Sequence, residues 1–594
     1  MKIIAVLASS FIVLVSSFAA DTRPNIIVIY TDDHGHADLG IRGIEKDLKT
    51  PNLDALARSG VIAKHGYSSA PQCVPSRGGL MTGKFQGRFN LDNNQSSLDG
   101  FNKETTIATR LQNAGYVTAQ FGKWHLGPLP EITRHGFRHV YAQHGQQKFS
   151  ANITADGKDR PMGDLAPEYY HLDGCSKAAA SIIERYKDDP FFLYIAFRAP
   201  HTPLDAPQSY KDRFPGEMPE RRRAALGMLA AVDEGVGLIT STLKKLGLTE
   251  KTLIFLIGDN GAPLKIHKTD SPLNGDAGGW DGSLNTPLNG EKGMLSEGGM
   301  HVPFLIAWPG TIPSGQIYEH PVSALDVAAT AAALADVKVN PGDLDGVNLI
   351  PHLTGENKAP PHDALMWRWV AQSAIREGKW KLLRGGDREY LYDLGADIEE
   401  KHNLASQEPE IATRLRSKLK AWADELNPPG MALGPMAPVW NDYFDFYLEG
   451  KPAQKPVAKT EPDTSATHGW IARNGTLTMK GGVFVLTPEN AKKPAFITRS
   501  QLKLAGPVTA KITLKTTATG AGAIAWRMSD DKDFLPANRV TFDLKATDDW
   551  QTHEITLPAN GRVIHLRVHV PPGPASIREI GVKSADGRFV SLLK

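Results

Sequence analysis

The sequence predicts an α/β protein whose large, mostly parallel sheet is flanked by helices, followed by a small α+β subdomain and a separate all-β sandwich. Three observations predict this order. Short apolar segments alternate with helical patterns up to about residue 260, strand-like runs and one helix follow, and no helical period returns after residue 466. At 594 residues the chain is too long for one core. We expect a leader over 1–20, an α/β domain over 21–360, a subdomain over 361–450, a linker over 451–465 and a β-sandwich over 466–594.

The first 20 residues are typical of a secretory signal peptide. A positive charge at Lys2 precedes an apolar run over 3–14, and small residues at 17–20 offer a cleavage site. The apolar run is too short for a membrane anchor. We therefore expect an exported protein, periplasmic or secreted, without membrane insertion.

The α/β region is built from unbroken apolar runs, which indicate strands buried on both faces, and from segments of helical spacing. The expected strands are Asn25–Tyr30, Tyr116–Phe121, Phe191–Phe197 and Thr252–Ile257, and the expected helices are Pro51–Ser59, Thr105–Ala114, Ala178–Tyr186 and Arg221–Leu246.

Each of the four expected strands is followed by a polar cluster. In open α/β sheets ligands bind beyond the carboxyl ends of the strands, so residues far apart in the chain can share one pocket. Each cluster alone has an ordinary reading as a helix cap, a core histidine or a turn, but their recurrence at strand ends favours a site. The clusters are Asp32-Asp33, Lys123 with His125, His201, and Asp259-Asn260.

The residue pattern changes in the C-terminal third of the chain. Short strand-like runs from residue 363 end in an amphipathic helix at 409–426, and residues 451–465 are rich in Pro, Ala and Lys, as linkers are. Alternating runs after residue 466 predict an antiparallel sandwich.

Residues 466–594 hold 10 Lys and 8 Arg against 7 Asp and 3 Glu, a net of +8. This charge fits either a module that binds a polyanion or scattered solvated charges; without interleaved aromatic and basic residues, nucleic acid is not the expected partner.

Residues 73–77 read Cys-Val-Pro-Ser-Arg and continue Gly-Gly-Leu-Met-Thr-Gly-Lys. This stretch resembles the signature of the type I sulfatases, of the alkaline phosphatase-like superfamily, and the resemblance covers about residues 25–426. It implies that a separate maturation enzyme oxidises Cys73 to formylglycine. The alternative for an exported protein is a disulfide between Cys73 and Cys175, the two cysteines of the chain. Conversion of Cys73 would leave Cys175 as a buried thiol without a partner.

The resemblance also implies a metal site. Asp32, Asp33, Asp259 and Asn260 match its ligands, and residue 73 would supply another oxygen. An all-oxygen set suits a hard cation, Ca²⁺ before Mg²⁺. The cation and Arg77 would favour the ionised diol of hydrated formylglycine.

Four further residues match the positions that surround the sulfate group in this family. A hypothetical course follows from them: one diol hydroxyl attacks sulfur while Asp259 takes its proton, and His201, aided by Lys292, protonates the leaving oxygen. His125 then deprotonates the second hydroxyl, which expels sulfate. The four residues are Lys123, His125, His201 and Lys292.

The expected activity is therefore hydrolysis of sulfate monoesters, with a sulfated polysaccharide or oligosaccharide as the substrate. A phosphatase or phosphodiesterase of the same superfamily and a non-catalytic glycan-binding protein remain alternatives. The sugar, the sulfate position, endo or exo action and the oligomeric state stay open. We expect loops over 138–150 and 263–285 to contact substrate, through His144, His267, Trp280 and Asp281. Two departures from the family pattern, His34-Gly35-His36 after Asp33 and Asn289 in place of Arg, leave the substrate in doubt.

Overall fold

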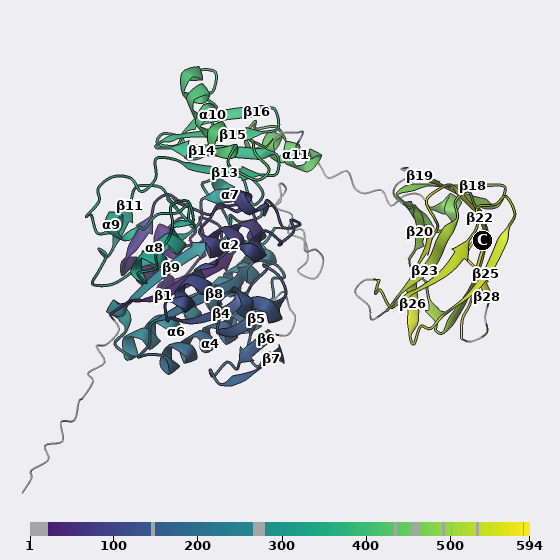
Figure 1. Ribbon diagram of the computed structural model, residues 1–594, viewed down its shortest axis with the longest axis horizontal. Coiled ribbons are helices and arrows are strands. Elements are labelled where there is room, and N and C mark those ends of the chain that lie inside the picture. Colours follow the sequence, from purple (N-terminus) through teal and green to yellow (C-terminus); the bar gives the residue numbers. More distant parts are fainter. Residues whose placement is uncertain are drawn as a thin grey trace, which may run out of the picture. The chain divides into compact units, whose positions relative to one another are not determined.

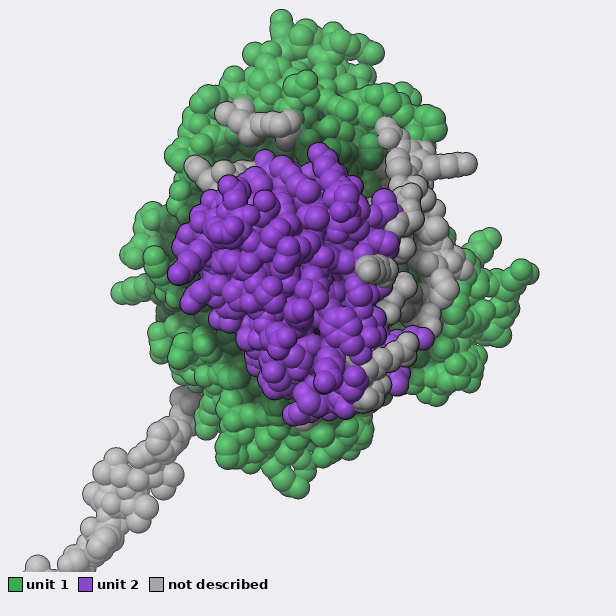
Figure 2. All heavy atoms as spheres, turned by 90° about the vertical axis from the view of Figure 1, so that its right-hand side faces the viewer, with its two compact units in different colours: residues 1–453 green, residues 454–594 purple. Residues whose placement is uncertain are grey.

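The computed structural model describes residues 22–143, 149–264, 280–432, 436–452, 464–489, 494–500, 502–529, 534–585, 587 and 589–593. The chain forms two compact units, residues 1–453 and 454–594, which are coloured separately in Figure 2. Each unit has its own hydrophobic core.

A ten-stranded sheet forms the centre of the first unit (Figure 1). Its five middle strands β9, β1, β8, β4 and β5 run parallel. Antiparallel pairs extend the sheet on both sides, and β11 pairs parallel with β2 at one edge. The expected parallel sheet is thus confirmed at the centre and mixed at the edges. In sheet order the strands are β11 (Gln316–Tyr318), β2 (Val61–Ala63), β10 (Phe304–Ala307), β9 (Thr252–Gly258), β1 (Asn25–Asp32), β8 (Phe191–Pro200), β4 (Val117–Lys123), β5 (His139–Gln143), β6 (Phe149–Ile153) and β7 (Asp159–Leu165).

Helices cover both faces of this sheet because its central strands carry apolar residues on both sides. Along β1, Ile27 and Ile29 pack into one core with α1, α4 and α6, whereas Ile26 and Val28 pack into a second core with α2, α3 and α8. These helices are α1 (Pro51–Arg58), α4 (His171–Arg185), α6 (Glu220–Lys245), α2 (Cys73–Thr82), α3 (Ile107–Asn113) and α8 (Asp326–Leu334); β3 (Gly66–Tyr67), β12 (Val322–Ser323), α5 (Gln208–Lys211), α7 (Glu297–Met300) and α9 (Ile350–Leu353) complete the domain.

Helix α6 is long and apolar enough to cross a membrane, alone among the helices of the described residues. Of its most apolar 18-residue window, 72% is buried inside the unit. Its residues Ala231, Val232 and Val236 are fully buried in the core shared with β1 and α4. The apolar sequence of α6 therefore matches its position as a core helix.

One expected loop is wrong in part. Residues 138–150 were expected to form a substrate loop, but β5 and β6 occupy both of its ends, with residues 144–148 outside the described part. The alternation of polar and apolar residues in this stretch is weak. The rings of Tyr141 and Phe149 nevertheless contact each other across the strands, with their centres 4.3 Å apart. That cross-strand aromatic contact is of the kind that stabilises sheets.

The subdomain that follows is an antiparallel sheet with a helix packed on it. Strands β13 (Leu365–Trp369), β14 (Gln372–Glu377), β15 (Trp380–Gly385) and β16 (Arg388–Asp393) pair in chain order, and α10 (Pro409–Ala423) covers one face through Leu415 and Leu419. A second helix, α11 (Pro438–Tyr447), was not expected. Phe444 of α11 is buried with Tyr390 of β16.

A buried charge network joins the subdomain to the α/β domain. The Lys381 ammonium on β15 lies 2.8 Å from Glu297 on α7 and 2.9 Å from Glu400. All three side chains are almost completely buried. Although burial alone would lower it, the two carboxylates raise the pKa of Lys381. The ammonium therefore stays charged and holds two carboxylates that would otherwise repel each other.

The second unit is a sandwich of two antiparallel sheets around a common core that includes Trp470 and Trp526, which confirms the expected all-β module. One sheet contains β17 (Ile471–Arg473), β20 (Phe496–Arg499), β26 (Arg562–His569), β23 (Gly520–Met528) and β24 (Arg539–Leu544), with β21 (Leu504–Ala505) beside β26. The other contains β18 (Gly475–Lys480), β19 (Val483–Pro488), β27 (Ala575–Lys583), β22 (Val508–Thr516) and β25 (Gln551–Leu557), with β28 (Phe589–Ser591) beside β27.

Replacement of Lys381 by Met should lower the free energy of unfolding of the first unit by about 3–5 kcal/mol, because two buried carboxylates lose their counter-charge. Chemical denaturation of the full-length protein measures this. The control is Lys418→Met, which removes an ion pair to Glu377 made by a lysine that is 38% exposed and should cost about 1 kcal/mol or less. Equal effects of the two substitutions would show that the network does not stabilise the domain contact.

Candidate functional site

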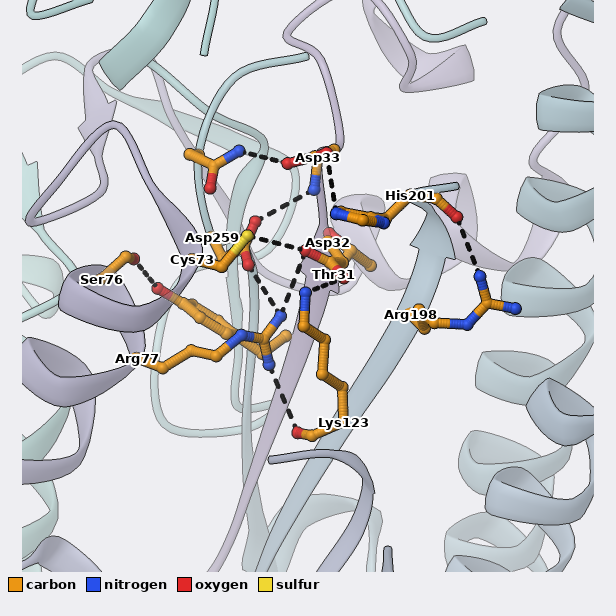
Figure 3. A network of polar contacts seen from close by, with 12 residues as sticks. Thr31, Asp32, Asp33, Cys73, Ser76, Arg77, Lys123, Arg198, His201 and Asp259 are labelled. Carbon is orange, nitrogen blue, oxygen red and sulfur yellow. Dashed lines mark hydrogen bonds and ion pairs between the residues drawn. The ribbon is translucent and has the colours of Figure 1, made fainter. Parts of the chain in front are cut away.

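The polar clusters expected at the strand ends meet in one pocket at the carboxyl edge of the sheet (Figure 3). Asp32 ends β1, Lys123 ends β4, and Asp259 follows β9 directly. Cys73 enters the same pocket as the first residue of α2, with its sulfur 3.4 Å from Asp32. The parallel order of β9, β1, β8 and β4 brings these residues together although they are far apart in sequence.

The backbone of Asp33 directs its carboxylate into this pocket. Neighbouring residues of a strand point to opposite faces, so Asp32 and Asp33 would diverge if the strand continued. Instead β1 ends at Asp32, and Asp33 adopts a left-handed conformation with φ 59°, which Asp tolerates better than most residues. Carboxylate oxygens of both residues consequently lie within 4.8 Å of each other and of Cys73.

Arg77, one turn after Cys73 on α2, is fully buried at the floor of the pocket. Its guanidinium lies 2.7 Å from the Asp259 carboxylate and 3.5 Å from that of Asp32, and it donates to the Tyr194 hydroxyl at 3.2 Å. The pKa of Arg77 is raised, since Tyr194 and the two carboxylates outweigh the opposing effect of burial. Arg77 is therefore a fixed cation that orients Asp259.

Two tyrosines belong to this floor that sequence reasoning missed. The Tyr30 hydroxyl bonds to the Ser76 hydroxyl at 2.6 Å, and Tyr194 bonds to Arg77. Both tyrosines lie inside strands that read as apolar core. Their one sequence signal is a hydroxyl within a fully buried strand, which needs a hydrogen-bonding partner.

Two lysines compensate the charge of the carboxylates. The Lys123 ammonium is 2.5 Å from Asp32, and the Lys292 ammonium is 2.6 Å from Asp33 and 3.3 Å from the Cys73 sulfur. Burial alone would raise the pKa of Asp32, but Lys123 and then His201 and Arg77 hold it well below its usual range. Asp32 and Asp33 are thus carboxylates at neutral pH despite their burial.

Asp259 differs from Asp32 and Asp33 in the direction of its pKa shift. Burial, followed by the charge of Asp32, raises the pKa of Asp259 to about 7, even though Arg77 contacts it. One oxygen of Asp259 accepts from the Asp33 amide at 3.0 Å. A carboxyl group with a pKa near neutrality is suited to take up and release a proton.

His201 lies at the open side of the pocket, after β8. Its Nε2 is 3.6 Å from Asp33, and its Nδ1 faces the Thr202 carbonyl, to which it can only donate. Nε2 is then the acceptor of a neutral ring. Burial lowers the pKa of His201 to about 4 despite Asp32 and Asp33, so the ring is neutral at pH 7 when the pocket holds no ligand.

The residues present fit a hard cation. Asp32, Asp33, Cys73 and His201 offer ligand atoms within 4.8 Å of one another. The side-chain oxygen of Asn260 is buried and has no hydrogen-bonding partner among the described residues, whereas its nitrogen donates to Asp33 at 2.6 Å. A buried amide oxygen without a partner, on a residue that contacts a carboxylate, is a group that a cation would satisfy.

The remaining predicted residues have separate positions, one of them beside the carboxylates. His125 follows β4 and lines a cavity of about 380 Å³ together with Val74 and Leu98. Asp281 is buried beside Asp33 and accepts from the Thr202 amide at 3.3 Å. Trp280 is packed against Ala262 and Leu264. His144 and His267 lie outside the described residues. The role of these residues in substrate binding stays a prediction.

The two departures from the family pattern also have defined positions. His34 is fully buried between Thr31 and the Asp38 carbonyl, and the His36 ring meets the His301 ring edge-on at 4.5 Å. Asn289 donates to the Tyr447 carbonyl on α11 at 2.6 Å. Asn289 therefore fastens the loop that carries Lys292 to a helix of the subdomain.

The two cysteines are not joined by a disulfide. Cys73 and Cys175 are both free and buried, on α2 and α4. Burial raises the pKa of the Cys73 thiol despite Lys123 and Lys292, so the unmodified side chain is a neutral thiol and a poor nucleophile.

Two sets of contacts that sequence reasoning missed position His201 and Lys292. The Arg198 guanidinium donates to the His201 carbonyl at 3.1 Å (Figure 3). It also donates to the Pro203 carbonyl at 2.9 Å and to the Asp205 carboxylate at 2.6 Å. On the other side, Gln372 of β14 accepts from the Leu295 amide and donates to the Gly293 carbonyl. Neither residue had a motif to mark it.

Comparison with known proteins places this pocket in a family. Residues 24–337 match the model described as Sulfatase, and residues 290–425 match the model described as N-sulphoglucosamine sulphohydrolase, C-terminal. The chain is 30% identical over 472 residues to bovine arylsulfatase A, covering 68% of this chain and 88% of that protein. It is 28% identical over 511 residues to the uncharacterized sulfatase YdeN of Escherichia coli K12, covering 70% of this chain and 88% of that protein.

Two solved structures have a fold similar to that of this chain. The crystal structure of Ps i-CgsB in complex with k-i-k-neocarrahexaose is similar with a TM-score of 0.60 and 31% identity, covering 71% of this chain and 97% of that chain. A structure of BT4656 in complex with D-glucosamine-2-N,6-O-disulfate shares the fold, with a TM-score of 0.55 and 22% identity, covering 68% of this chain and 98% of that chain.

Replacement of Arg198 by Met should lower kcat for a sulfate ester by about tenfold or more with little change in KM, because His201 loses its fixed position. Arg185→Met is the control, since Arg185 pairs with an Asp159 that is 62% exposed and lies outside the pocket. Steady-state kinetics and thermal melting of both variants separate positioning from folding. An Arg198 variant with normal kcat would contradict this role.

Proposed function

This chain belongs to the sulfatase family and is a sulfuric ester hydrolase, and from that premise we propose that it removes sulfate from a sulfated polysaccharide or oligosaccharide. The observation that carries this proposal is the pocket in which Cys73, three carboxylates and the cations Arg77, Lys123 and Lys292 converge. Residue 73 would act as formylglycine formed by a maturation enzyme, with Ca²⁺ as the bound cation.

Support for a saccharide substrate comes from relatives. Ps i-CgsB was crystallised with k-i-k-neocarrahexaose, and rat N-acetylgalactosamine-6-sulfatase is 30% identical over 367 residues, covering 56% of this chain and 66% of that protein. The leader pattern over residues 1–20 supports export. An exported enzyme would meet polysaccharides outside the cytoplasm. Fractionation of producing cells, with mass analysis of the mature N-terminus, tests this location.

The cation would be held by Asp32, Asp33, Asp259 and Asn260, and when bound it would supply positive charge beside residue 73. Formylglycine would supply a hydrated aldehyde, whose two hydroxyls allow ester transfer and then self-release. All other steps belong to the residues of the chain.

The geometry supports the following roles in charge stabilisation and proton transfer. Lys123 and Lys292, which flank Cys73 and the carboxylates, would neutralise the sulfate oxygens. Asp259, with its pKa of about 7, would take the proton of the attacking hydroxyl. His201, at the open side where its Nε2 faces the pocket, would give a proton to the leaving sugar oxygen after the bound anionic ester has raised its pKa enough for Nε2 to hold that proton, with Lys292 beside it. The family resemblance assigns deprotonation of the second hydroxyl to His125, which lines the cavity beside Val74.

Replacement of Cys73 by Ser should abolish multiple turnover, because a single alcohol can accept sulfate but cannot expel it. The measurement is desulfation of a panel of defined sulfated oligosaccharides, with a phosphate ester as the comparison substrate. Peptide mass analysis of the wild-type protein should show an aldehyde at position 73, and one thiol, Cys175, should titrate after denaturation. Full turnover by the Ser variant would refute the aldehyde mechanism, and faster turnover of the phosphate ester would favour a phosphatase.

Removal of the cation should lower both activity and melting temperature, and Ca²⁺ should restore both, because Asp32, Asp33 and Asp259 crowd together without it. The loss of stability should be larger at about pH 8 than at about pH 6. The pKa of Asp259 is raised to about 7 in the folded protein, so folding becomes less favourable as that group ionises.

Asp259→Asn is the matched variant. It should be inactive, yet its melting temperature should respond less to chelator than that of the wild type, since one of the repelling charges is gone. Elemental analysis of purified protein identifies the ion. If chelator leaves activity and melting temperature unchanged and no metal is found, the cation site does not exist.

A further inference from the structure

One face of the β-sandwich unit gathers positive charge. In the sheet β17-β20-β26-β23-β24, Ile497, Trp526 and Val568 point into the core. Successive side chains of a strand alternate between the two faces, so the neighbours of these residues along each strand point outward. The outward positions of the described residues include one carboxylate, Asp543 on β24. The cationic face is defined by Arg473, Arg527, Arg539, His565, Arg567 and His569.

Within the described part of the chain, the two arginines at the centre of this face have no ion-pair partner. Among the residues that the structure describes, no carboxylate lies within ion-pair distance of Arg539 or Arg567. The opposite sheet differs, because there Lys511 pairs with Glu579 at 3.2 Å. Like charges held together without a counter-charge favour an anionic ligand.

Arg567 is also held in a fixed orientation. Its guanidinium lies 3.7 Å from the ring centre of Phe534 and 5.5 Å from that of Phe496, and Phe496 in turn stacks on His569 at 4.7 Å. A guanidinium stacked on an aromatic ring keeps its N–H donors in the plane of the group, where they can bind an anion with two hydrogen bonds. Its Nε is buried without a hydrogen-bonding partner among the described residues.

The small residues of β23 allow this packing. Ala523 and Ala525 face outward between β26 and β24, where they pair with His569 and Arg567 on one side and with Thr541 and Arg539 on the other. Both alanines are nearly fully buried, so the longer side chains lie across them. Ala525 pairs with both Arg567 and Arg539, so the two arginines occupy neighbouring strands at the same level. Burial and then the charges of these two arginines lower the pKa of His569 to about 4.

We propose that the cationic face is a second binding site, distinct from the pocket around Cys73, that holds the sulfate groups of a sulfated polysaccharide chain. A row of outward side chains across neighbouring strands suits an extended polymer, and the stacked arginine suits tetrahedral oxyanions. The choice of a sulfated chain over another polyanion rests on the proposed function. Because the two units are one chain, binding at this face raises the local concentration of substrate for the catalytic unit.

Full-length protein carrying Arg539→Gln and Arg567→Gln tests this site. The control carries Lys515→Gln and Arg578→Gln, which remove the same charge from the other sheet, where both residues flank Trp550 at 5.4 and 4.6 Å. The probes are carrageenan as a sulfated polymer, hyaluronan as a carboxylated polymer without sulfate, and a DNA duplex, each measured for Kd at several salt concentrations.

The test variant should bind carrageenan about tenfold or more weakly than wild type, whereas the control should stay within about threefold. Its kcat/KM on carrageenan oligomers too short to span both sites should equal that of wild type, and its kcat/KM on the polymer should fall. Arg539 is exposed, so Arg539→Gln alone keeps the test valid if the double variant melts early.

Equal weakening of both double variants would show binding by net charge alone and would overturn the proposal. Unchanged carrageenan binding by the Arg539 and Arg567 variants would also overturn the proposal. So would DNA or hyaluronan binding that is as tight as carrageenan binding or tighter and depends on these arginines in the same way. Selective binding of carrageenan by a protein that hydrolyses no sulfate ester would support this site while refuting the proposed function, so the two failures are distinguishable.

Discussion

The structure of the catalytic unit depends on charge balance in a deeply buried pocket. Asp32, Asp33 and Asp259 are each at most 1% exposed, and isolated carboxylates in such a place would be protonated or would unfold the protein. Arg77, Lys123 and Lys292 supply the compensation at 2.5–2.7 Å. Each of these cations comes from a different element, so the charge balance holds only when helix α2, strand β4 and the loop that carries Lys292 are all in place.

This dependence explains why the subdomain contributes to the site although it adds no residue to the pocket. The loop around Lys292 is held by Gln372 on β14 and by Tyr447, whose hydroxyl donates to Glu291 at 3.0 Å. The next segment is fastened through Glu297 to Lys381 on β15. A catalytic lysine on an otherwise unsupported loop would lose orientation, and orientation is a large part of catalysis by charge. The subdomain therefore acts as a scaffold for one side of the pocket.

Charge also distinguishes the two units. With a net charge of +8 after residue 466 in a chain of +2 overall, residues 1–465 carry −6. A catalytic unit of that sign gains little from long-range attraction of an anionic polymer, apart from its buried cations. A basic unit in the same chain supplies that attraction, and the clustering of Arg539, Arg567 and His569 on one sheet concentrates it.

The sequence by itself determined the α/β order, the central strands, the sandwich and the residues that enter the pocket, because buried parallel strands have unbroken apolar runs and because the Cys73 motif and the strand-end clusters are local patterns. It did not determine what only tertiary contacts decide. Strands β5 and β6, helix α11, the hydroxyls of Tyr30 and Tyr194, and the Arg198 and Gln372 contacts have no local signal, since their partners lie distant in the chain. The meeting of Asp32 and Asp33 in one pocket required the left-handed turn at Asp33. The gathering of positive charge on the cationic face required the alignment of four strands, which no single strand encodes.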